Sequence, residues 1–396
     1  MINLSRLLFD YETEGDRLRY RSDLKQSKPI VVWNITRRCN LKCRHCYSDS
    51  KNRFYPGEVK KEEAFRILAD LASYKIPVVL FSGGEPLLRP GIFELVAKAR
   101  DLGLRPVLST NGTMITKDTA RELKKAGLAY AGVSLDGVEE RNDFFRGVSG
   151  AYLKTLKGIR NAQDAGIKTG LRFTITRLNM AEIPAIFDLI DKENIVRACF
   201  YHLVCTGRGS NLREVSLTPW ETRQTMDTIV SLSGELFFDK RKAEILTVDN
   251  HADGAYLYLQ MKKRDPARAK KIYSLLKING GNRSGIGIAG MDWNGQITPD
   301  QFWQSRVLGN IHRNKFAEIW DNPKNPTLKR LREKPRRIKG RCGECRFLEI
   351  CNGNFRARAD VILNDPWASD PACYLSDEEI GLKKVKSQRS KVIFEC

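Results

Sequence analysis

Apolar residues between positions 30 and 204 recur in short runs that are typical of buried β-strands. Each run is four to eight residues long and is separated from the next by a longer, more polar stretch. The runs are Ile30–Ile35, Val78–Phe81, Pro106–Ser109, Tyr130–Leu135, Lys168–Ile175 and Ala198–Val204. Because a helical pattern follows nearly every run, the six strands predict a parallel sheet.

Amphipathic stretches with a helical period lie between these runs. They are Lys61–Ser73, Gly91–Leu102, Lys117–Gly127, Ala151–Ala165 and Ala181–Glu193. Gly127 and Gly166 stand where two of the helices end, a position that commonly takes a left-handed glycine. Repeated βα units curl into a barrel whose catalytic loops follow the carboxyl ends of the strands. We therefore expect an α/β fold, a partial (β/α)6 barrel of the TIM type.

The alternation of strands and helices is lost from about Thr218, where a second part of the chain begins. A charged helical stretch, Lys262–Lys277, leads into a glycine-rich run, Asn279–Gly290. We expect three segments, namely 1–28 as an N-terminal segment, 29–215 as the barrel, and 216–396 as linker helices with a smaller C-terminal domain.

The composition argues against several classes of protein. A chain of 396 residues with 41% hydrophobic content can bury a large core. No apolar run approaches the roughly 18 residues that a membrane span needs, and the first twenty residues lack the profile of a signal peptide. We therefore expect a cytoplasmic protein with no membrane span. Its ten cysteines are then not expected to form disulfides, and the tight clusters among them are expected to be metal or iron–sulfur ligands.

The formal net charge of +21 favours an anionic partner, because positive surface potential concentrates polyanions. Nucleic acid, an anionic membrane surface and a polycarboxylate small molecule all meet this requirement. The alternative is a generally basic, solvated surface, and the basic stretch Lys383–Lys391 is expected to be a solvated terminus. Charge alone does not choose among these.

Three cysteines with the spacing C-x3-C-x2-C follow the first strand directly: Cys39, Cys43 and Cys46. Four thiolates ordinarily hold an iron–sulfur cubane, so three leave one iron open. An open iron can take an exogenous chelate, which distinguishes a catalytic site from a closed structural one. We predict a [4Fe-4S] cluster on these cysteines; the alternatives are a zinc site or unrelated thiols of the core.

This spacing, with the aromatic Tyr47 after it, resembles the signature of the radical S-adenosylmethionine (SAM) superfamily over about residues 28–215. The resemblance implies that the amino and carboxylate groups of SAM chelate the open iron. It also implies that the reduced cluster cleaves SAM to a 5′-deoxyadenosyl radical, while the protein orients the cofactor.

Ser82–Pro86, after the second strand, resembles the GGE motif of the superfamily, which contacts the amino group of SAM. Gly83 and Gly84 would let the backbone approach the ligand closely. Glu85 could accept a charge-assisted hydrogen bond from the ammonium. The alternative is an ordinary turn.

Polar side chains end the next two strands, where the superfamily places groups on the ribose and carboxylate of SAM. Asn111 follows the third strand, and Ser134 and Asp136 follow the fourth. Each is also compatible with a turn or a helix cap. Arg172, in the fifth strand, is a candidate to meet the SAM carboxylate, and the alternative is an ion pair at the barrel edge. We predict these four as cofactor-binding residues together with Gly83, Gly84 and Glu85.

A second cysteine group has the spacing C-x2-C-x5-C-x21-C and consists of Cys342, Cys345, Cys351 and Cys373. Four thiolates close a cubane or a zinc tetrahedron. The C-x2-C-x5-C portion resembles part of the SPASM extension, which carries auxiliary [4Fe-4S] clusters, and this favours iron and sulfur. Asp300 and Asn354 stand where the fuller pattern has cysteine. We therefore expect one auxiliary cluster, and two [4Fe-4S] clusters in the chain.

Three longer stretches resemble the tetrapyrrole-modifying branch of the superfamily: Gly15–Tyr20, Val31–Cys43 and Val248–Gly254. The resemblance implies an anionic iron-tetrapyrrole substrate, 12,18-didecarboxysiroheme, whose acetate side chains are removed to give Fe-coproporphyrin III in haem biosynthesis. Loss of propionate groups from the same substrate, in haem d1 biosynthesis, is the alternative within the branch. His251 could meet the substrate or its iron, and arginines near the strand ends suit its carboxylates.

The resemblance also implies an electron donor as a partner, and the motifs argue against three other classes of protein. Radical chemistry requires an electron donor such as ferredoxin or flavodoxin. A peptide-modifying SPASM enzyme usually has a peptide-recognition domain ahead of the barrel, and fewer than 40 residues precede Cys39. An RNA-modifying enzyme would suit the charge, but the sequence has no RNA-binding module, so we expect no nucleic-acid partner. A non-enzymatic iron–sulfur or zinc protein would need no GGE motif.

Overall fold

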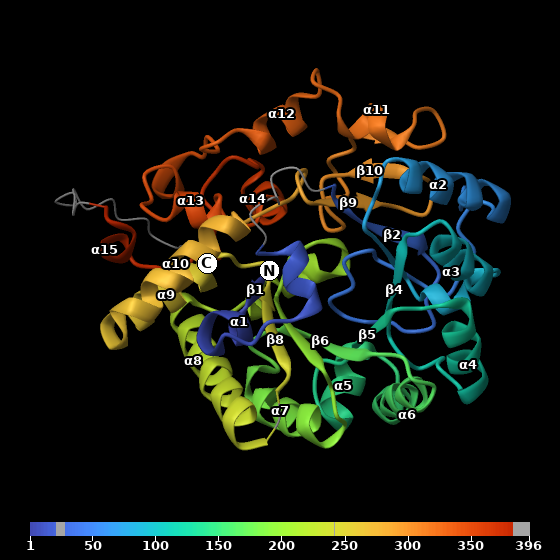
Figure 1. Ribbon diagram of the computed structural model, residues 1–396, viewed down its shortest axis with the longest axis horizontal. Helices are drawn as coiled ribbons and strands as arrows, with labels where there is room; N and C mark the ends of the chain where they lie inside the picture. The colour runs from blue at the N-terminus through green and yellow to red at the C-terminus, as the bar shows by residue number, and fades with distance from the viewer. Residues whose placement is uncertain (21–27, 241, 383–396) are drawn as a thin grey trace.

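The structure, a computed structural model, describes residues 1–20, 28–240 and 242–382. Within them the strands form one sheet in the order β1-β8-β7-β6-β5-β4-β3-β2-β9-β10-β11 (Figure 1). Seven adjacent strands are parallel and form the wall of a partial barrel. They are β2 (Ile30–Thr36), β3 (Val78–Gly83), β4 (Arg105–Thr110), β5 (Tyr130–Ser134), β6 (Thr169–Ile175), β7 (Arg197–His202) and β8 (Glu244–Val248). The predicted α/β partial barrel is confirmed.

Six of these strands lie within two residues of their predicted bounds. They are buried along most of their length, as the fully buried Val31, Phe81 and Phe200 illustrate, so the apolar runs that predicted them are the core of the barrel. The seventh parallel strand, β8, was not predicted. It extends the sheet past residue 215, where we expected the barrel to end; that division into segments stays a prediction about folding units.

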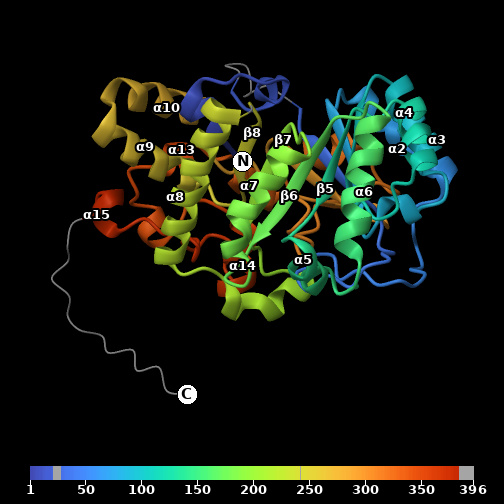
Figure 2. The same cartoon turned by 90° about the horizontal axis from the view of Figure 1, so that it is seen from below.

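Helices follow the strands and cover the outer face of the barrel wall (Figures 1 and 2). They are α2 (Lys61–Ser73), α3 (Ile92–Asp101), α4 (Lys117–Ala126), α5 (Glu139–Arg146), α6 (Ala151–Asp164), α7 (Ile183–Lys192) and α8 (Pro219–Glu235). Their apolar faces, with Leu68, Leu95 and Leu123, pack against the strands in a shared core. Gly127 ends α4 in the left-handed conformation, with a φ of 89°, as its position predicted.

The C-terminal part of the chain lies beside β2 and over one end of the barrel (Figure 1). It is joined to the sheet by β9 (Ile288–Met291), which runs parallel to β2 and forms an antiparallel hairpin with β10 (Gln296–Thr298). The other elements are α9 (Ala252–Arg264), α10 (Pro266–Asn279), β11 (Gly309–Asn310), α11 (Phe316–Trp320), α12 (Pro326–Arg332), α13 (Leu348–Cys351), α14 (Arg356–Leu363) and α15 (Asp377–Ile380).

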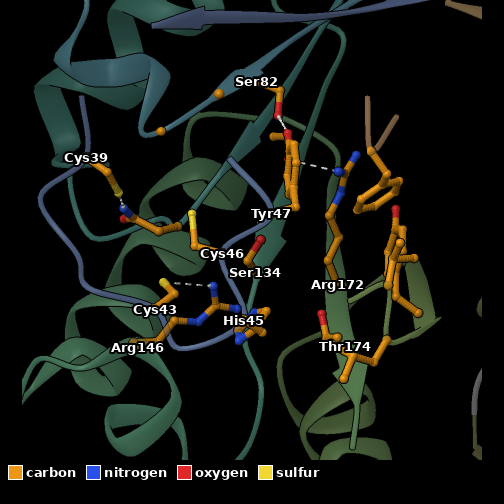
Figure 3. Close-up of a pocket in the computed structure, with 18 of the residues that line it drawn as sticks. Cys39, Cys43, His45, Cys46, Tyr47, Ser82, Ser134, Arg146, Arg172 and Thr174 are labelled. Atoms are coloured by element: carbon orange, nitrogen blue, oxygen red, sulfur yellow. Dashed lines mark hydrogen bonds between the residues drawn. The ribbon is translucent and has the colours of Figure 1, made fainter. Parts of the chain in front are cut away.

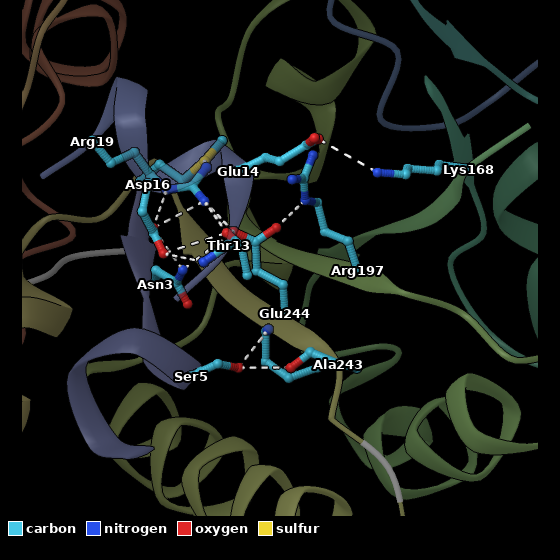
Figure 4. Close-up of polar contacts among 12 residues, drawn as sticks. Asn3, Ser5, Thr13, Glu14, Asp16, Arg19, Lys168, Arg197, Ala243 and Glu244 are labelled. Atoms are coloured by element: carbon cyan, nitrogen blue, oxygen red, sulfur yellow. Dashed lines mark hydrogen bonds and ion pairs between the residues drawn. The ribbon is translucent and has the colours of Figure 1, made fainter. Parts of the chain in front are cut away.

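The N-terminal residues are fastened to β8 at the far edge of the barrel. They form β1 (Ile2–Asn3), which pairs with β8, then α1 (Leu4–Phe9) and a 3-10 turn, Glu14–Leu18. The buried carboxylate of Glu244 forms ion pairs with both Arg19 and Arg197 (Figure 4). This network holds the N-terminal segment against the amino ends of the strands.

Among the described residues, no helix combines the length and the apolar character that crossing a bilayer requires. The basic stretch Lys383–Lys391 and Cys396 lie outside the described residues.

Candidate functional site

A cavity of about 150 Å³ lies at the carboxyl ends of the barrel strands. Cys39, Cys43 and Cys46 line one side of it, and Arg172 lies on the opposite side (Figure 3). Gly83, Gly84, Asn111 and Ser134 also line it. The structure therefore brings together eight of the predicted site residues from β2, β3, β4, β5 and β6. Parallel strands deliver them to one place because their carboxyl ends share one edge of the sheet.

The loop that carries the three cysteines is fixed by contacts along its backbone. The Lys42 and Arg44 N–H groups donate to the carbonyls of Arg146 (3.0 Å) and Phe145 (2.9 Å) at the end of α5. Arg208, beyond β7, donates from Nε to the Cys43 carbonyl (2.9 Å) and from its backbone N–H to that of Cys46 (3.0 Å). Two distant parts of the barrel thus hold the loop in one conformation.

The three cysteine side chains are buried or partly buried thiols, and a cation lies beside one of them. Burial raises the pKa of Cys39 to about 12 and also raises the pKa of Cys43. The Nη1 atom of Arg146 lies 3.7 Å from the Cys43 sulfur and partly offsets that effect. Such thiols become thiolates when a bound metal supplies positive charge.

The donor set suits an iron–sulfur cluster better than a single ion. Within the described part of the chain, no three His, Cys, Asp or Glu side chains are arranged to hold one metal ion. In a cubane each thiolate binds a different iron atom, so three cysteines can hold the cluster and leave one iron open. The three thiols, all on one side of a cavity, fit that arrangement.

Gly83 and Gly84 are required by the way β3 meets the cysteine loop. A Cβ at position 83 would lie 2.2 Å from the Thr36 carbonyl oxygen, and Gly83 has a φ of 127°. A Cβ at position 84 would lie 2.2 Å from the Arg38 carbonyl oxygen. Only glycine lets these backbones meet, and both glycines also line the cavity.

Glu85 is not among the residues that line this cavity, and its hydrogen bond from SAM stays a prediction. Its side chain is fully buried and accepts hydrogen bonds from the Thr110 hydroxyl and the Asn111 N–H, both at 2.8 Å. Burial raises the pKa of Glu85 to about 7. Glu85 therefore positions the end of β4, including Asn111, from behind the cavity wall.

Asp136 likewise lies behind the wall, although we predicted that it contacts SAM. It pairs with the Arg146 guanidinium at 2.5 Å and with His45 Nε2 at 3.1 Å, while Oδ1 accepts from the Thr174 N–H. Burial acts to raise the pKa of Asp136, but the charges of Arg146 and His45 outweigh it and lower the pKa to about 2. Asp136 thus orients two cavity-lining residues.

A second, larger cavity of about 470 Å³ fills the barrel interior on the side of the strand amino ends. This volume is in the range of small-molecule sites. Apolar side chains such as Val32, Leu80 and Val107 form part of its wall, and the N-terminal residues 14–19 close part of it. His251 lines this cavity and is buried. Arginines line it as well: Arg17, Arg19, Arg105, Arg172, Arg197 and Arg283.

Sequence reasoning gave no site role to several residues that line the smaller cavity, among them His45, Arg146, Tyr201 and Asp249. Arg146 ends α5, more than a hundred residues from Cys43. Asp249 follows β8 with a left-handed φ of 65°, which is unusual for aspartate. The position of Asp249 after a five-residue strand was the available signal, but that strand itself was not predicted.

The second cysteine group also gathers in space. Cys342 is buried, and the pKa of Cys351 is raised by burial and by the nearby Cys373, Cys342 and Cys345. Gly281 lies against Cys351, since a Cβ there would approach its backbone to 2.3 Å. Four mutually close thiols with no paired disulfide fit a closed cubane.

Asp300 and Asn354, which stand at the departures from the SPASM pattern, have structural partners. Asp300 accepts hydrogen bonds from Ser284 (2.5 Å) and from the Phe302 N–H (2.9 Å). Asn354 bonds to Asn250 at 2.7 Å and accepts from the His251 N–H at 2.6 Å. Both side chains therefore stabilise turns.

Comparison with known proteins agrees with this geometry. Residues 33–190 match the radical SAM superfamily, and residues 285–346 match SPASM, an iron–sulfur cluster-binding domain. The chain is 47% identical to Fe-coproporphyrin III synthase of Methanosarcina barkeri, over 96% of this chain and 99% of that protein. It is 42% identical to pre-heme d1 synthase of Dinoroseobacter shibae, over 89% of this chain and 88% of the relative.

A solved structure has a similar fold. Streptococcus suis SuiB, bound to its precursor peptide SuiA, superimposes with a TM-score of 0.70 over 88% of this chain and 76% of its own. The two sequences are 18% identical, so this likeness concerns the fold alone.

Proposed function

The chain belongs to the radical SAM superfamily, and from that premise we propose that it removes the two acetate side chains of 12,18-didecarboxysiroheme to give Fe-coproporphyrin III. The observation that carries this proposal is the match to Fe-coproporphyrin III synthase along nearly the whole of both chains. The larger cavity supports it, because it shares lining residues with the smaller cavity that holds the cysteines, and a tetrapyrrole needs a space within reach of the radical.

The enzyme uses two [4Fe-4S] clusters and SAM. Cys39, Cys43 and Cys46 would hold the catalytic cluster and leave one iron for SAM. Cys342, Cys345, Cys351 and Cys373 would hold the auxiliary cluster. When bound, SAM and the catalytic cluster supply the radical that begins the reaction.

The protein's own residues position the reactants. We place SAM against Gly83, Gly84, Asn111, Ser134 and Arg172, which line the smaller cavity with the cysteines. Arg146 lies between Cys43 and Asp136 and keeps positive charge beside the thiolate. Tyr47 donates to Asn34 at 2.7 Å and packs against Phe302 with ring centroids 5.0 Å apart, which helps to close the cavity to water.

The second cavity would hold the tetrapyrrole. Its apolar wall suits a macrocycle, and its arginines suit peripheral carboxylates, since guanidinium binds carboxylate through two parallel hydrogen bonds. The net charge of +21 would attract the polyanionic substrate. We further propose a ferredoxin or flavodoxin as electron donor and a cytoplasmic location, where free cysteines stay reduced.

A second candidate reaction is the removal of propionate groups from the same substrate, which the match to pre-heme d1 synthase favours. Anaerobic turnover of 12,18-didecarboxysiroheme, followed by mass spectrometry of the tetrapyrrole, distinguishes the two. Two losses matching acetate support the proposal. Losses matching propionate would replace it with the second candidate.

A further inference from the structure

Arg336 and Arg356 are buried beside the second cysteine group, with exposed fractions of 1% and 0%. Among the described residues neither forms an ion pair with a carboxylate, and the nearby buried carboxylate of Asp370 pairs with Arg358 at 2.9 Å. A buried guanidinium is costly unless an anion compensates its charge. The two charges therefore indicate that an anion belongs at this site.

The hydrogen bonds of the Arg336 guanidinium go to neutral groups among the described residues. One of them is the carbonyl of Asn352, the residue directly after Cys351, at 2.9 Å. Burial and the like charge of Arg356 lower the pKa of Arg336 from 12.5 to about 9, whereas negative charge at Cys351 raises it. The negative charge that favours this guanidinium is thus the one that a cysteine ligand carries.

Arg356, the first residue of α14, holds the same turn of the chain. Its Nη2 atom donates to the Gly353 carbonyl, and its Nη1 atom donates to two further backbone carbonyls. Its Nε atom is buried without a hydrogen-bond partner. Burial lowers the pKa of this guanidinium, and negative charge at Asp370, Cys342 and Cys351 opposes that effect.

The turn Asn352–Asn354 is shaped to keep both guanidinium groups next to a cysteine ligand. Its three residues have left-handed φ values of 57°, 77° and 60°, which are uncommon for residues other than glycine. Two carbonyls of this turn accept hydrogen bonds from Arg336 and Arg356. The backbone that follows Cys351 therefore fixes two positive charges at the cysteine group.

We propose that Arg336 and Arg356 compensate the charge of the auxiliary cluster and raise its reduction potential. The inference rests on the assignment of the second cysteine group to that cluster in the proposed function. A cubane on four thiolates is an anion, and net charge is one of the factors that set its potential. Reduction adds one electron from an external low-potential donor and breaks no bond. Positive charge nearby favours the reduced, more negative state, so the two guanidinium groups make the cluster a better electron acceptor.

The test is a redox titration of the anaerobic holoenzyme, with electron paramagnetic resonance used to follow both clusters. The variant with Cys39, Cys43 and Cys46 changed to Ala, which should keep the auxiliary cluster alone, identifies the signal of that cluster. Arg336→Gln and Arg356→Gln should each lower the equilibrium constant for its reduction at least about tenfold, which is about 59 mV for one electron. The potential of the catalytic cluster should change less.

Arg332→Gln is the matched control, because Arg332 is a partly buried arginine of the same part of the chain that donates to the carbonyls of Gly285 and Trp320. It should leave the potential of the auxiliary cluster unchanged. Arg336→Lys and Arg356→Lys keep the charge without the planar fork, so their potentials should stay close to that of wild type. Equal iron content establishes that each variant retains both clusters.

The inference is overturned if the auxiliary potential is unchanged in both Gln variants, if both clusters shift equally, or if the Lys variants fall as far as the Gln variants. Where a Gln variant loses iron, its Lys counterpart decides, since a wild-type potential supports the role of charge and a lowered potential overturns it. A wild-type enzyme with iron on the catalytic cysteines alone would instead overturn the assignment of the auxiliary cluster itself.

Discussion

The Nη1 atom of Arg146 lies 3.7 Å from the sulfur of Cys43, a contact between the end of α5 and the cysteine loop. A positive charge beside a cluster thiolate favours the reduced, more negative state. Arg146→Gln should therefore lower the reduction potential of the catalytic cluster, on the order of 100 mV if the contact is a typical charge-assisted hydrogen bond. A redox titration followed by electron paramagnetic resonance measures this.

The conservative Arg146→Lys variant should stay closer to wild type, because it keeps the charge. Arg121→Gln, at an exposed position on α4, is the matched control. An unchanged potential in Arg146→Gln would show that this guanidinium has a structural role through Asp136 only.

The two cysteine groups should be separable by iron content. Reconstituted wild-type enzyme should contain about eight irons per chain, and either group changed to Ala should leave about four. Only the loss of Cys39, Cys43 and Cys46 should abolish SAM cleavage. Loss of the four C-terminal cysteines should leave uncoupled SAM cleavage while tetrapyrrole turnover falls. One equivalent of zinc with four irons in anaerobically isolated wild-type enzyme would contradict the auxiliary cluster.

Asp249 should make stability depend on pH. Its pKa is raised from 3.8 to about 7, chiefly by burial, while Arg358 and His202 oppose the shift and Asp300 adds to it. The folded chain then binds more protons than the unfolded chain between about pH 4 and 7, so stability falls as pH rises through that window and levels off above it.

Asp249→Asn cannot ionise, so the difference between its melting temperature and that of wild type should grow in its favour from about pH 4 to pH 7 and stay constant above pH 7. The corresponding free energy is at most about 1.4 kcal/mol for each pH unit. Asp118→Asn, at an exposed carboxylate, should show a margin that does not vary. The same constant margin in Asp249→Asn would disprove the shift.

Glu244 should be the main polar fastening of the N-terminal segment. It is buried and pairs with Arg19 and Arg197, so Glu244→Gln leaves Arg197 without its carboxylate partner and Arg19 with Asp16 alone. The free energy of unfolding should fall by about 3–5 kcal/mol, measured by denaturant titration under anaerobic conditions.

Glu14 on the same segment pairs with Arg105 at the exposed rim. It also pairs there with Lys168 (Figure 4). Glu14→Gln should change stability little, because solvent screens such pairs. Equal losses in Glu14→Gln and Glu244→Gln would mean that burial does not decide the strength of this network.

The sequence predicted well the strands whose own residues are mostly apolar, because such a run indicates a buried strand directly. The run Ile30–Ile35 is apolar except for Asn34, and the structure extends it only to Thr36. By contrast, β8 spans five residues after a long interruption, and its place depends on pairing with β7 and β1. That pairing joins residues that are far apart in the sequence, and the short apolar run Ile245–Val248 alone does not distinguish a strand from a buried helical segment.

The candidate site likewise contains residues whose place the sequence indicated and residues whose side-chain direction it did not. The position of Cys39 follows from the motif spacing and that of Gly83 from backbone contact, and both residues line the smaller cavity. The side chains of Glu85 and Asp136 turn away from it because Asn111 and Arg146 meet them from other elements. Sequence placed these carboxyls at the correct strand ends, but their directions are set by tertiary contacts.

The measurement that tests the account most directly counts 5′-deoxyadenosine and identifies the tetrapyrrole in the same anaerobic reaction, with 12,18-didecarboxysiroheme as substrate. We predict two molecules of 5′-deoxyadenosine for each Fe-coproporphyrin III, with a mass change that matches the loss of two acetates, and neither product from the Cys39, Cys43 and Cys46 triple variant. Formation of 5′-deoxyadenosine with no change in tetrapyrrole mass, in enzyme that contains both clusters, would contradict it.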